Sequence, residues 1–147
     1  MYEVVIQIHR YLSWLLLGAA AFALFRAWSG LIFRKYWSSA DKLAGNLFTG
    51  LIDLQLVAGI ILYAGLSPVT TAVFSNFREG IREPELRFYA VDHILVMVFA
   101  FILIHTGRSL ARKAQFASRK HRISAVWFTL ATALILFRIP WERIFAM

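Results

Sequence analysis

Four apolar segments, each about as long as a lipid bilayer is thick, take up most of this chain. They cover residues 4–25, 43–66, 88–107 and 123–139, and a helix needs about 20 apolar residues to cross the hydrocarbon core. Hydrophobic residues fill 60% of the 147 positions, which is more than a water-soluble domain of this size can bury. The sequence therefore predicts an all-α integral membrane protein, a single domain over residues 1–147 that forms an up-down-up-down four-helix bundle.

Positive charge is unevenly distributed among the connections between these segments. The long connection balances its arginines with acidic residues, whereas the two short connections are strongly basic. Their cations are Arg26, Arg34, Lys35 and Lys42 in the first, and Arg108, Arg112, Lys113, Arg119, Lys120 and Arg122 in the second. The positive-inside rule places both short connections in the cytoplasm and both termini outside. The net charge of +8 indicates contact with anionic lipid and not with nucleic acid, because the cations flank the membrane segments.

The long connection, residues 67–87, mixes large apolar side chains with charged ones. Two interpretations remain open for it: a short amphipathic helix on the outer surface that ends near Pro84, or a plain charged loop. At the other end of the chain, Pro140 is expected to end the fourth segment.

Two histidines lie at matching depths in two different segments. His9 is about five residues inside the first segment, and His93 is about five residues inside the third. The first and third segments run in the same direction, so both imidazoles are expected about 7 Å below the same membrane face. Two imidazoles that face each other across a bundle are the ligands of a b-type haem, with ligating nitrogens about 4 Å apart. Hydrogen-bonded interfacial histidines, or a site for another metal, are the alternatives.

The other residues near that face restrict what the pair can hold. The chain has no cysteine, which excludes thiolate ligands, iron–sulfur clusters and covalent haem attachment. A haem b bound here is therefore non-covalent. Its propionates would meet cations at the outer face, for which the candidates are Arg10, Arg87, Arg138 and Arg143.

A second and weaker pair lies near the inner face. His105 follows His93 by twelve residues, about 18 Å further in at helical rise, and His121 lies where the fourth segment begins. These two imidazoles predict an inner site and a second haem, unless His121 is simply an exposed member of the basic run around it.

Asp53 lies near the middle of the second segment, with Gln55 as close polar company. A lone charge at this depth is costly, so we expect the carboxyl group to be protonated or paired with a donor on another helix. As functional roles we consider a proton relay, a hydrogen bond to a quinone or a hydrogen bond to a ligating histidine. The alternative is a structural hydrogen bond between helices.

Several short motifs resemble those of small bacterial four-span membrane proteins described as cytochrome b-like. The motifs are His-Arg-Tyr-Leu-Ser-Trp at 9–14, Asp-Leu-Gln-Leu at 53–56 with Gly59 and Tyr63, Arg-Phe-Tyr-Ala-Val-Asp-His at 87–93, and Lys-His-Arg at 120–122. The resemblance covers most of the chain and implies a multi-pass protein of the bacterial inner (plasma) membrane. Such proteins often carry a histidine where this chain has Asp53, and this departure weakens haem ligation from the second segment.

Three functions fit these features. The first is an electron carrier that holds haem and exchanges electrons with a quinol or a redox protein. The second is a non-catalytic anchor subunit of a larger membrane complex, or a homo-oligomer, which needs the helices but not the paired histidines. The third is a proton or metal path that uses Asp53 and His105. The chain has no motif for acyl or phosphoryl transfer, and whether it is an enzyme stays open.

Overall fold

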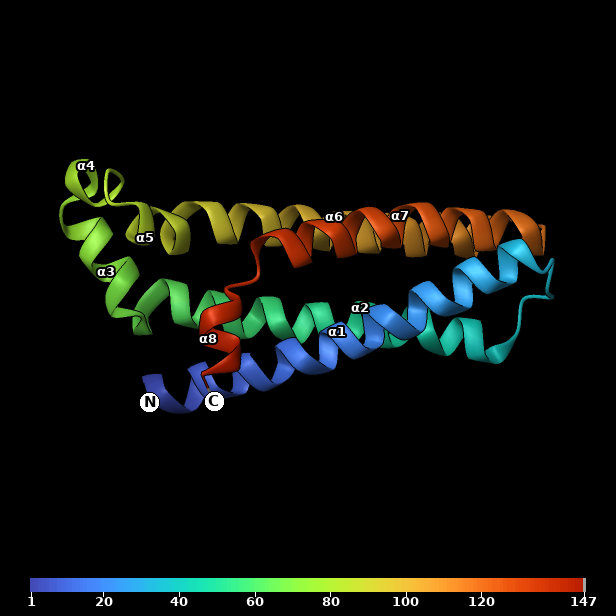
Figure 1. Ribbon diagram of the computed structural model, residues 1–147, viewed down its shortest axis with the longest axis horizontal. Coiled ribbons are helices and arrows are strands. Elements are labelled where there is room, and N and C mark those ends of the chain that lie inside the picture. The colour runs from blue at the N-terminus through green and yellow to red at the C-terminus, as the bar shows by residue number, and fades with distance from the viewer. Residues whose placement is uncertain (147) are drawn as a thin grey trace.

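The computed structural model describes residues 1–146, which are almost entirely helical and contain no strand (Figure 1). Its four long helices are α1 (Tyr2–Ile32), α2 (Ser39–Ile61), α6 (His93–Lys113) and α7 (Ala117–Arg138). A π-helical turn, Leu62–Leu66, extends α2, and another, Phe88–Asp92, leads into α6. The short helices are α3 (Pro68–Ser75), α4 (Phe77–Gly80), α5 (Pro84–Arg87) and α8 (Trp141–Phe145).

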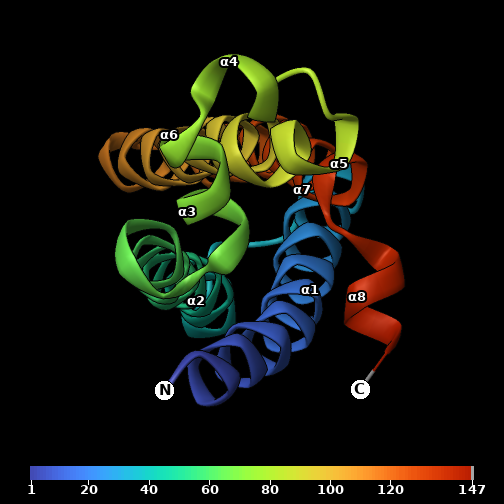
Figure 2. The same ribbon diagram turned by 90° about the vertical axis from the view of Figure 1, so that its left-hand side faces the viewer.

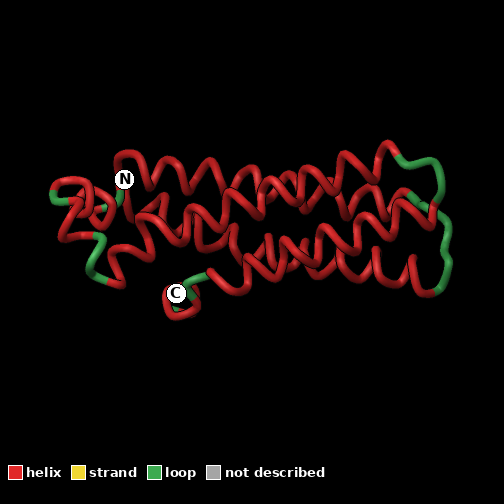
Figure 3. Tube along the Cα trace, turned by 90° about the horizontal axis from the view of Figure 1, so that it is seen from above, coloured by secondary structure: helices red, strands yellow, loops and turns green. Residues whose placement is uncertain are grey.

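The four long helices pack side by side with α2, α1, α7 and α6 in order around the bundle (Figure 2). Helices α3, α4 and α5 lie at the end that also holds both chain termini, and we call this the terminal end. The two short connections, residues 33–38 and 114–116, lie together at the opposite end, the loop end (Figure 3). Each long helix therefore runs antiparallel to the helices next to it in sequence, while α1 and α6 face each other diagonally and run parallel.

Three helical stretches are long and apolar enough to cross a membrane: α1, α2 with its π-helical extension (Ser39–Leu66), and the run Pro84–Lys113. These stretches contain three of the four apolar segments expected from the sequence. Helix α7 has 22 residues but begins with a basic run, which lowers its mean hydropathy. The structure thus shows three candidate spans, and a fourth span at residues 123–139 stays a prediction.

The helices continue past the apolar segments because local contacts at the loop end support extra turns. Helix α1 ends where Arg34 adopts a left-handed backbone conformation, with φ of 53°. Helix α2 then begins with the Asp41 carboxylate accepting hydrogen bonds from the backbone N–H and the hydroxyl of Ser38, at 2.7 and 2.9 Å. An acidic side chain three residues into a helix satisfies free N–H groups in this way.

The long connection differs from both interpretations of the sequence. Residues 67–87 form three short helices, not one amphipathic helix or a plain loop. Pro68 occupies the first turn of α3, and Pro84 begins α5 instead of ending a helix. Proline suits the first turn because the missing N–H would have no partner there.

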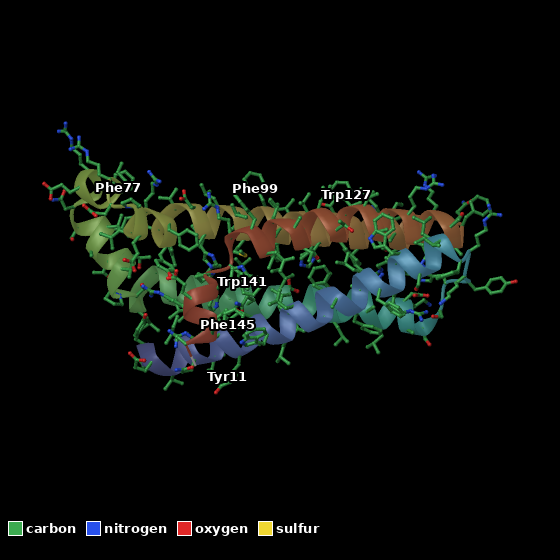
Figure 4. The ribbon with its side chains drawn as sticks, viewed as in Figure 1. Tyr11, Phe77, Phe99, Trp127, Trp141 and Phe145 are labelled. Carbon is green, nitrogen blue, oxygen red and sulfur yellow. The ribbon has the colours of Figure 1, made fainter. Side chains whose placement is uncertain are left out.

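The core lies in the middle of the bundle and depends on small residues. Ala100 and Ala131 are fully buried, and they let α6 and α7 approach closely. Phe48 of α2 meets Phe128 of α7 edge to face, with ring centres 5.3 Å apart. Outward positions carry large apolar side chains, and Figure 4 shows Tyr11 and Phe99 pointing away from the bundle on opposite sides. Apolar residues on both the inside and the outside are typical of a helix bundle in lipid.

Candidate functional site

The structure brings His9 of α1 and His93 of α6 together near the terminal end. Their ring centres are 6.5 Å apart, and the ring planes are inclined by 77°. Two imidazoles on opposite sides of one metal have ring centres about 6.4 Å apart, from bonds of about 2.0 Å and about 1.2 Å from nitrogen to ring centre. The separation of the two ring centres is therefore compatible with a metal ion held between them.

The ring of His93 is held by the end of α7. His93 Nδ1 donates a hydrogen bond to the backbone carbonyl of Arg138 at 2.9 Å. Arg138 is the last residue of α7, where carbonyl groups have no partner within the helix. A proton on Nδ1 leaves the lone pair on Nε2, and metal-ligating histidines are usually fixed by such a bond from the second nitrogen.

The ring of His9 is held more loosely, by α2. The Gln55 amide nitrogen donates to Ser13 Oγ at 2.7 Å, and its distance to His9 Nε2 is 3.4 Å. The second value is long for a hydrogen bond. His9 Nδ1 and Gln55 Oε1 are buried without any partner. A Cβ atom on Gly59 would lie 3.4 Å from His9 Cε1, so the ring rests against the backbone of α2.

A cavity of about 140 Å³ adjoins both histidines. Its walls come from all four long helices, from the two π-helical turns, and from α3 and α8. Arg10 and Arg143 also line it, and Arg10 Nε is buried without a partner. Since buried polar atoms nearly always have a hydrogen-bond partner, the free atoms of His9, Arg10 and Gln55 indicate a polar occupant of this cavity.

The four arginines expected near the site separate into different roles. Arg10 and Arg143 line the cavity. Arg138 supplies its carbonyl to His93, while its guanidinium lies over the Phe137 ring at 4.7 Å. Neither Arg87 nor Arg138 lines the cavity, and Arg87 Nε lies 3.8 Å from the Asp92 carboxylate.

Sequence reasoning did not find the aromatic walls of the cavity. Tyr63 and Tyr89 line it from the two π-helical turns, and Tyr63 donates a hydrogen bond to the carbonyl of Ala90 at 2.8 Å. Arg143 Cζ lies 4.2 Å from the centre of the Tyr89 ring. Both tyrosines lie in the motifs that carry the cytochrome b-like resemblance, but tyrosines near the ends of membrane segments look like ordinary interfacial anchors, so they were not predicted to line the site. The π-helical turns, which often occur at functional sites, have no sequence signature.

The predicted inner pair of His105 and His121 is not formed. His121 is fully buried against Gly30 and Trp37, and its Nε2 lies 3.2 Å from the carbonyl oxygen of Lys35. His105 instead donates to Asp53 Oδ1 at 2.6 Å. Each imidazole thus has its own partner, and His121 is a packing residue, neither an exposed cation nor half of a second haem site.

Asp53 and Gln55 lie on different sides of α2, although the sequence grouped them as one proton or quinone site. Gln55 is buried and points to His9 and Ser13. Asp53 has the interhelical donor that its depth requires, His105 on α6, but both side chains remain exposed, at 49% and 40%. Two residues apart on a helix do not share a face, which explains the separation.

Comparisons with known proteins add no family to this geometry, since no family model, no curated protein and no solved structure matches the chain. The resemblance to cytochrome b-like proteins thus remains a hypothesis from short motifs. Within residues 1–146, no group of three or more His, Asp or Glu side chains is arranged to hold a metal ion. The candidate site therefore rests on two ligands, which suffices for an iron whose other four ligands come from a porphyrin.

Proposed function

We propose that this protein is a membrane electron-transfer protein that holds one non-covalent haem b between His9 and His93. The observation that carries the proposal is the meeting of two half-buried imidazoles, with ring centres 6.5 Å apart, beside a cavity lined by two arginines. When bound, haem supplies a one-electron redox couple. His9 and His93 would hold the iron, and the chemistry supplied there would be electron transfer, without oxygen binding.

Each residue of the site has a role that follows from its contacts. The Arg138 carbonyl fixes the tautomer of His93 and presents its Nε2 lone pair. Gln55 holds His9 only weakly, through a 3.4 Å contact, so the ring would be free to act as a ligand. Arg10 and Arg143 would offset the charge of haem propionates. Apolar side chains of α2, α6 and α7 that line the cavity would keep water out of it.

The cavity must widen to accept a porphyrin, because about 140 Å³ is close to the space that a benzene-sized ligand fills. Helix α8 is the wall best suited to move. It has only five residues. Its Phe145 ring, labelled in Figure 4, lies 5.4 Å from the Trp14 ring of α1 and is largely exposed. Outward displacement of α8 enlarges the cavity without separating the four long helices.

We also propose that α7 is the fourth span, and that the terminal end faces outward from a bacterial plasma membrane. This proposal is supported by the antiparallel packing of α7 against α6 and α1 and by the basic connections at the loop end. The histidine pair then lies near the outer face. A quinol in the bilayer or a redox protein at the outer surface would be the exchange partner.

A non-catalytic anchor subunit is the competing function, since all of the helix packing would serve it. The proton or metal path through Asp53 and His105 has less support. That pair is half exposed on the flank of the bundle and does not line the cavity. The two competing functions share one consequence: neither requires a cofactor between His9 and His93.

A visible spectrum of the protein purified from membranes of cells supplied with haem precursor tests the proposal. We expect a sharp α-band in the reduced-minus-oxidised difference, and His9→Ala or His93→Ala should each abolish or grossly alter it. His105→Ala is the matched control and should retain the band. It is a better control than His121→Ala, because His121 is fully buried. A wild-type protein that stays colourless while folded and in the membrane refutes the haem assignment.

A further inference from the structure

A line of polar groups runs between α2 and α6 on one side of the bundle. Asn46, Gly50 and Asp53 follow each other on one face of α2 at i, i+4 and i+7, and His105 and Arg108 face them from α6. We call these five residues the α2/α6 seam. Arg108 donates two hydrogen bonds to Asn46 Oδ1, at 2.6 and 3.2 Å, and His105 donates to Asp53 at 2.6 Å.

The seam is the most open side of the bundle. Of the four pairs of neighbouring long helices, α2 and α6 pack the most loosely, and Figure 2 shows these two on one side of the bundle and α1 and α7 on the other. A Cβ atom on Gly50 would meet nothing within 4 Å. Between the two polar pairs, the surface of α2 is therefore free for close approach from outside.

An exposed acid–imidazole pair in this place is energetically unfavourable on its own. Asp53 lies in the middle of an apolar helix that is long enough to span a membrane, and its side chain is 49% exposed. Ionisable groups at such depth almost always face the inside of a bundle or a water-filled cavity. Here the pair faces outward, so a polar surface has to cover it within the membrane.

The length of the seam indicates whether a small ligand or a second pair of helices covers it. Asn46 and Asp53 are seven residues apart, about 10 Å along the helix axis. A ligand with a single ring-sized head group covers one of the two polar pairs, Asn46 with Arg108 or Asp53 with His105, and leaves the other pair exposed to lipid. A second helical surface with matching polar groups covers both, and Gly50 between them permits the short helix–helix distance that such packing in lipid uses.

We propose that the seam is a dimer interface at which a second copy of this chain covers the first. A two-fold axis along the membrane normal keeps both copies in the same orientation and places residues of equal depth opposite each other. Helix α2 of one copy then faces α6 of the other. Asp53 of each copy therefore lies opposite His105 of the partner subunit, which gives two equivalent contacts. Donors and acceptors are complementary in this arrangement, and the interface does not depend on any cofactor at His9 and His93.

Because the chain has no cysteine, single cysteines test this interface directly. Gly50→Cys places a thiol in the seam. Gly18→Cys is the matched control, since Gly18 also has nothing within 4 Å of its would-be Cβ but lies on the outward face of α1. The depths are equal: Gly18 is nine residues beyond His9 on α1, and Gly50 is nine residues from Gly59, which contacts His9.

The measurement is the covalent dimer formed when intact membranes that contain the full chain are treated with a flexible thiol-to-thiol cross-linker. A spacer is needed because each Gly50 faces α6 of the other copy, so the two introduced thiols lie diagonally across the interface and are too far apart for a direct disulfide. We expect Gly50→Cys to give mostly dimer and Gly18→Cys mostly monomer. Adding Asp53→Leu or, as a milder change, Asn46→Leu to Gly50→Cys should reduce dimer formation, roughly tenfold for Asp53→Leu. The proposal is overturned if Gly50→Cys cross-links no more than Gly18→Cys. It is also overturned if cross-linking is unchanged by both leucine substitutions, or if only a lipid-soluble ligand occupies the seam of a monomer.

Discussion

The imidazole of His121 lies where a side chain on residue 30 would otherwise be. A Cβ atom added to Gly30 would overlap the ring of His121, which is completely buried. Trp37 covers the other side of the ring, with ring centres 5.0 Å apart. A residue in a run of cations thus becomes part of the contact between α1 and α7, because one neighbour has no side chain.

We expect Gly30→Ala to destabilise the protein by about 1–3 kcal/mol, the range for forcing extra volume into a packed site. The substitution pushes the His121 ring and α7 away from α1. Thermal unfolding in detergent measures the effect. Gly18→Ala is the control, because its added methyl group meets nothing within 4 Å; it should leave the midpoint unchanged or slightly raised. Equal midpoints for the two variants would contradict the packing role of His121.

At the scale of the elements, an ion pair joins α1 to α2 at the loop end. Arg26 Nε donates to Asp41 Oδ1 at 2.8 Å, and a second guanidinium nitrogen donates to Ser38 Oγ at 3.0 Å. The Asp41 side chain is almost wholly buried, and that of Arg26 is 23% exposed. The carboxylate therefore has two roles, because it also accepts the hydrogen bonds that begin α2.

Asp41→Ala should cost up to about 3 kcal/mol, the low end of the range for breaking a buried ion pair, because it leaves the partly buried Arg26 without its partner and removes the support for the first turn of α2. Denaturation followed by helical circular dichroism measures the loss. Glu85→Ala is the matched control because Glu85 also pairs with an arginine, Arg143, but its side chain is 77% exposed. Exposed ion pairs contribute little, so a loss as large for Glu85→Ala as for Asp41→Ala would speak against a special role for Asp41.

The long helices were predictable from the sequence, and the short ones were not. Continuous apolar runs of membrane length identified α1, α2 and α6 directly. The ends of these helices depend on side-chain contacts such as that of Ser38 with Asp41, between residues that the sequence pattern does not pair in advance. Residues 67–87 form three short helices because two prolines each start one, and a charged stretch with scattered apolar residues does not predict such breaks.

The sequence predicted the candidate site only where the depth of a residue along its helix is enough to determine its position. Equal depth on parallel helices was enough to predict that His9 and His93 lie at one level. Equal depth does not determine which way a side chain points, and for that reason the expected pair of His105 and His121 was wrong. For the same reason the expected level of the four arginines did not determine which of them line the cavity: Arg10 and Arg143 do, and Arg87 and Arg138 do not.

For the whole molecule, the orientation in the membrane is the main testable property. Reporter fusions after Lys35 and after Lys113, at the loop end, should behave as cytoplasmic. A fusion near Arg82, at the terminal end, should behave as exported. The motivation is ten Lys and Arg residues in residues 26–42 and 108–122 against the single acid Asp41. The reverse pattern would move the histidine pair to the inner face and change its exchange partner.

The modest hydropathy of α7 has a consequence for how the protein is assembled during synthesis. A segment that the lipid alone holds weakly enters the membrane more efficiently together with a strongly apolar neighbour, and only residues 114–116 separate α7 from α6. The two helices should therefore insert as one hairpin. Helix α7 provides the Arg138 carbonyl that fixes His93, and α8, which follows α7 in the chain, closes the cavity. A growing chain therefore cannot form the pocket before this hairpin has formed. Binding of the proposed haem would then be a late step of biogenesis, and ribosome-bound chains that end before α7 should bind none.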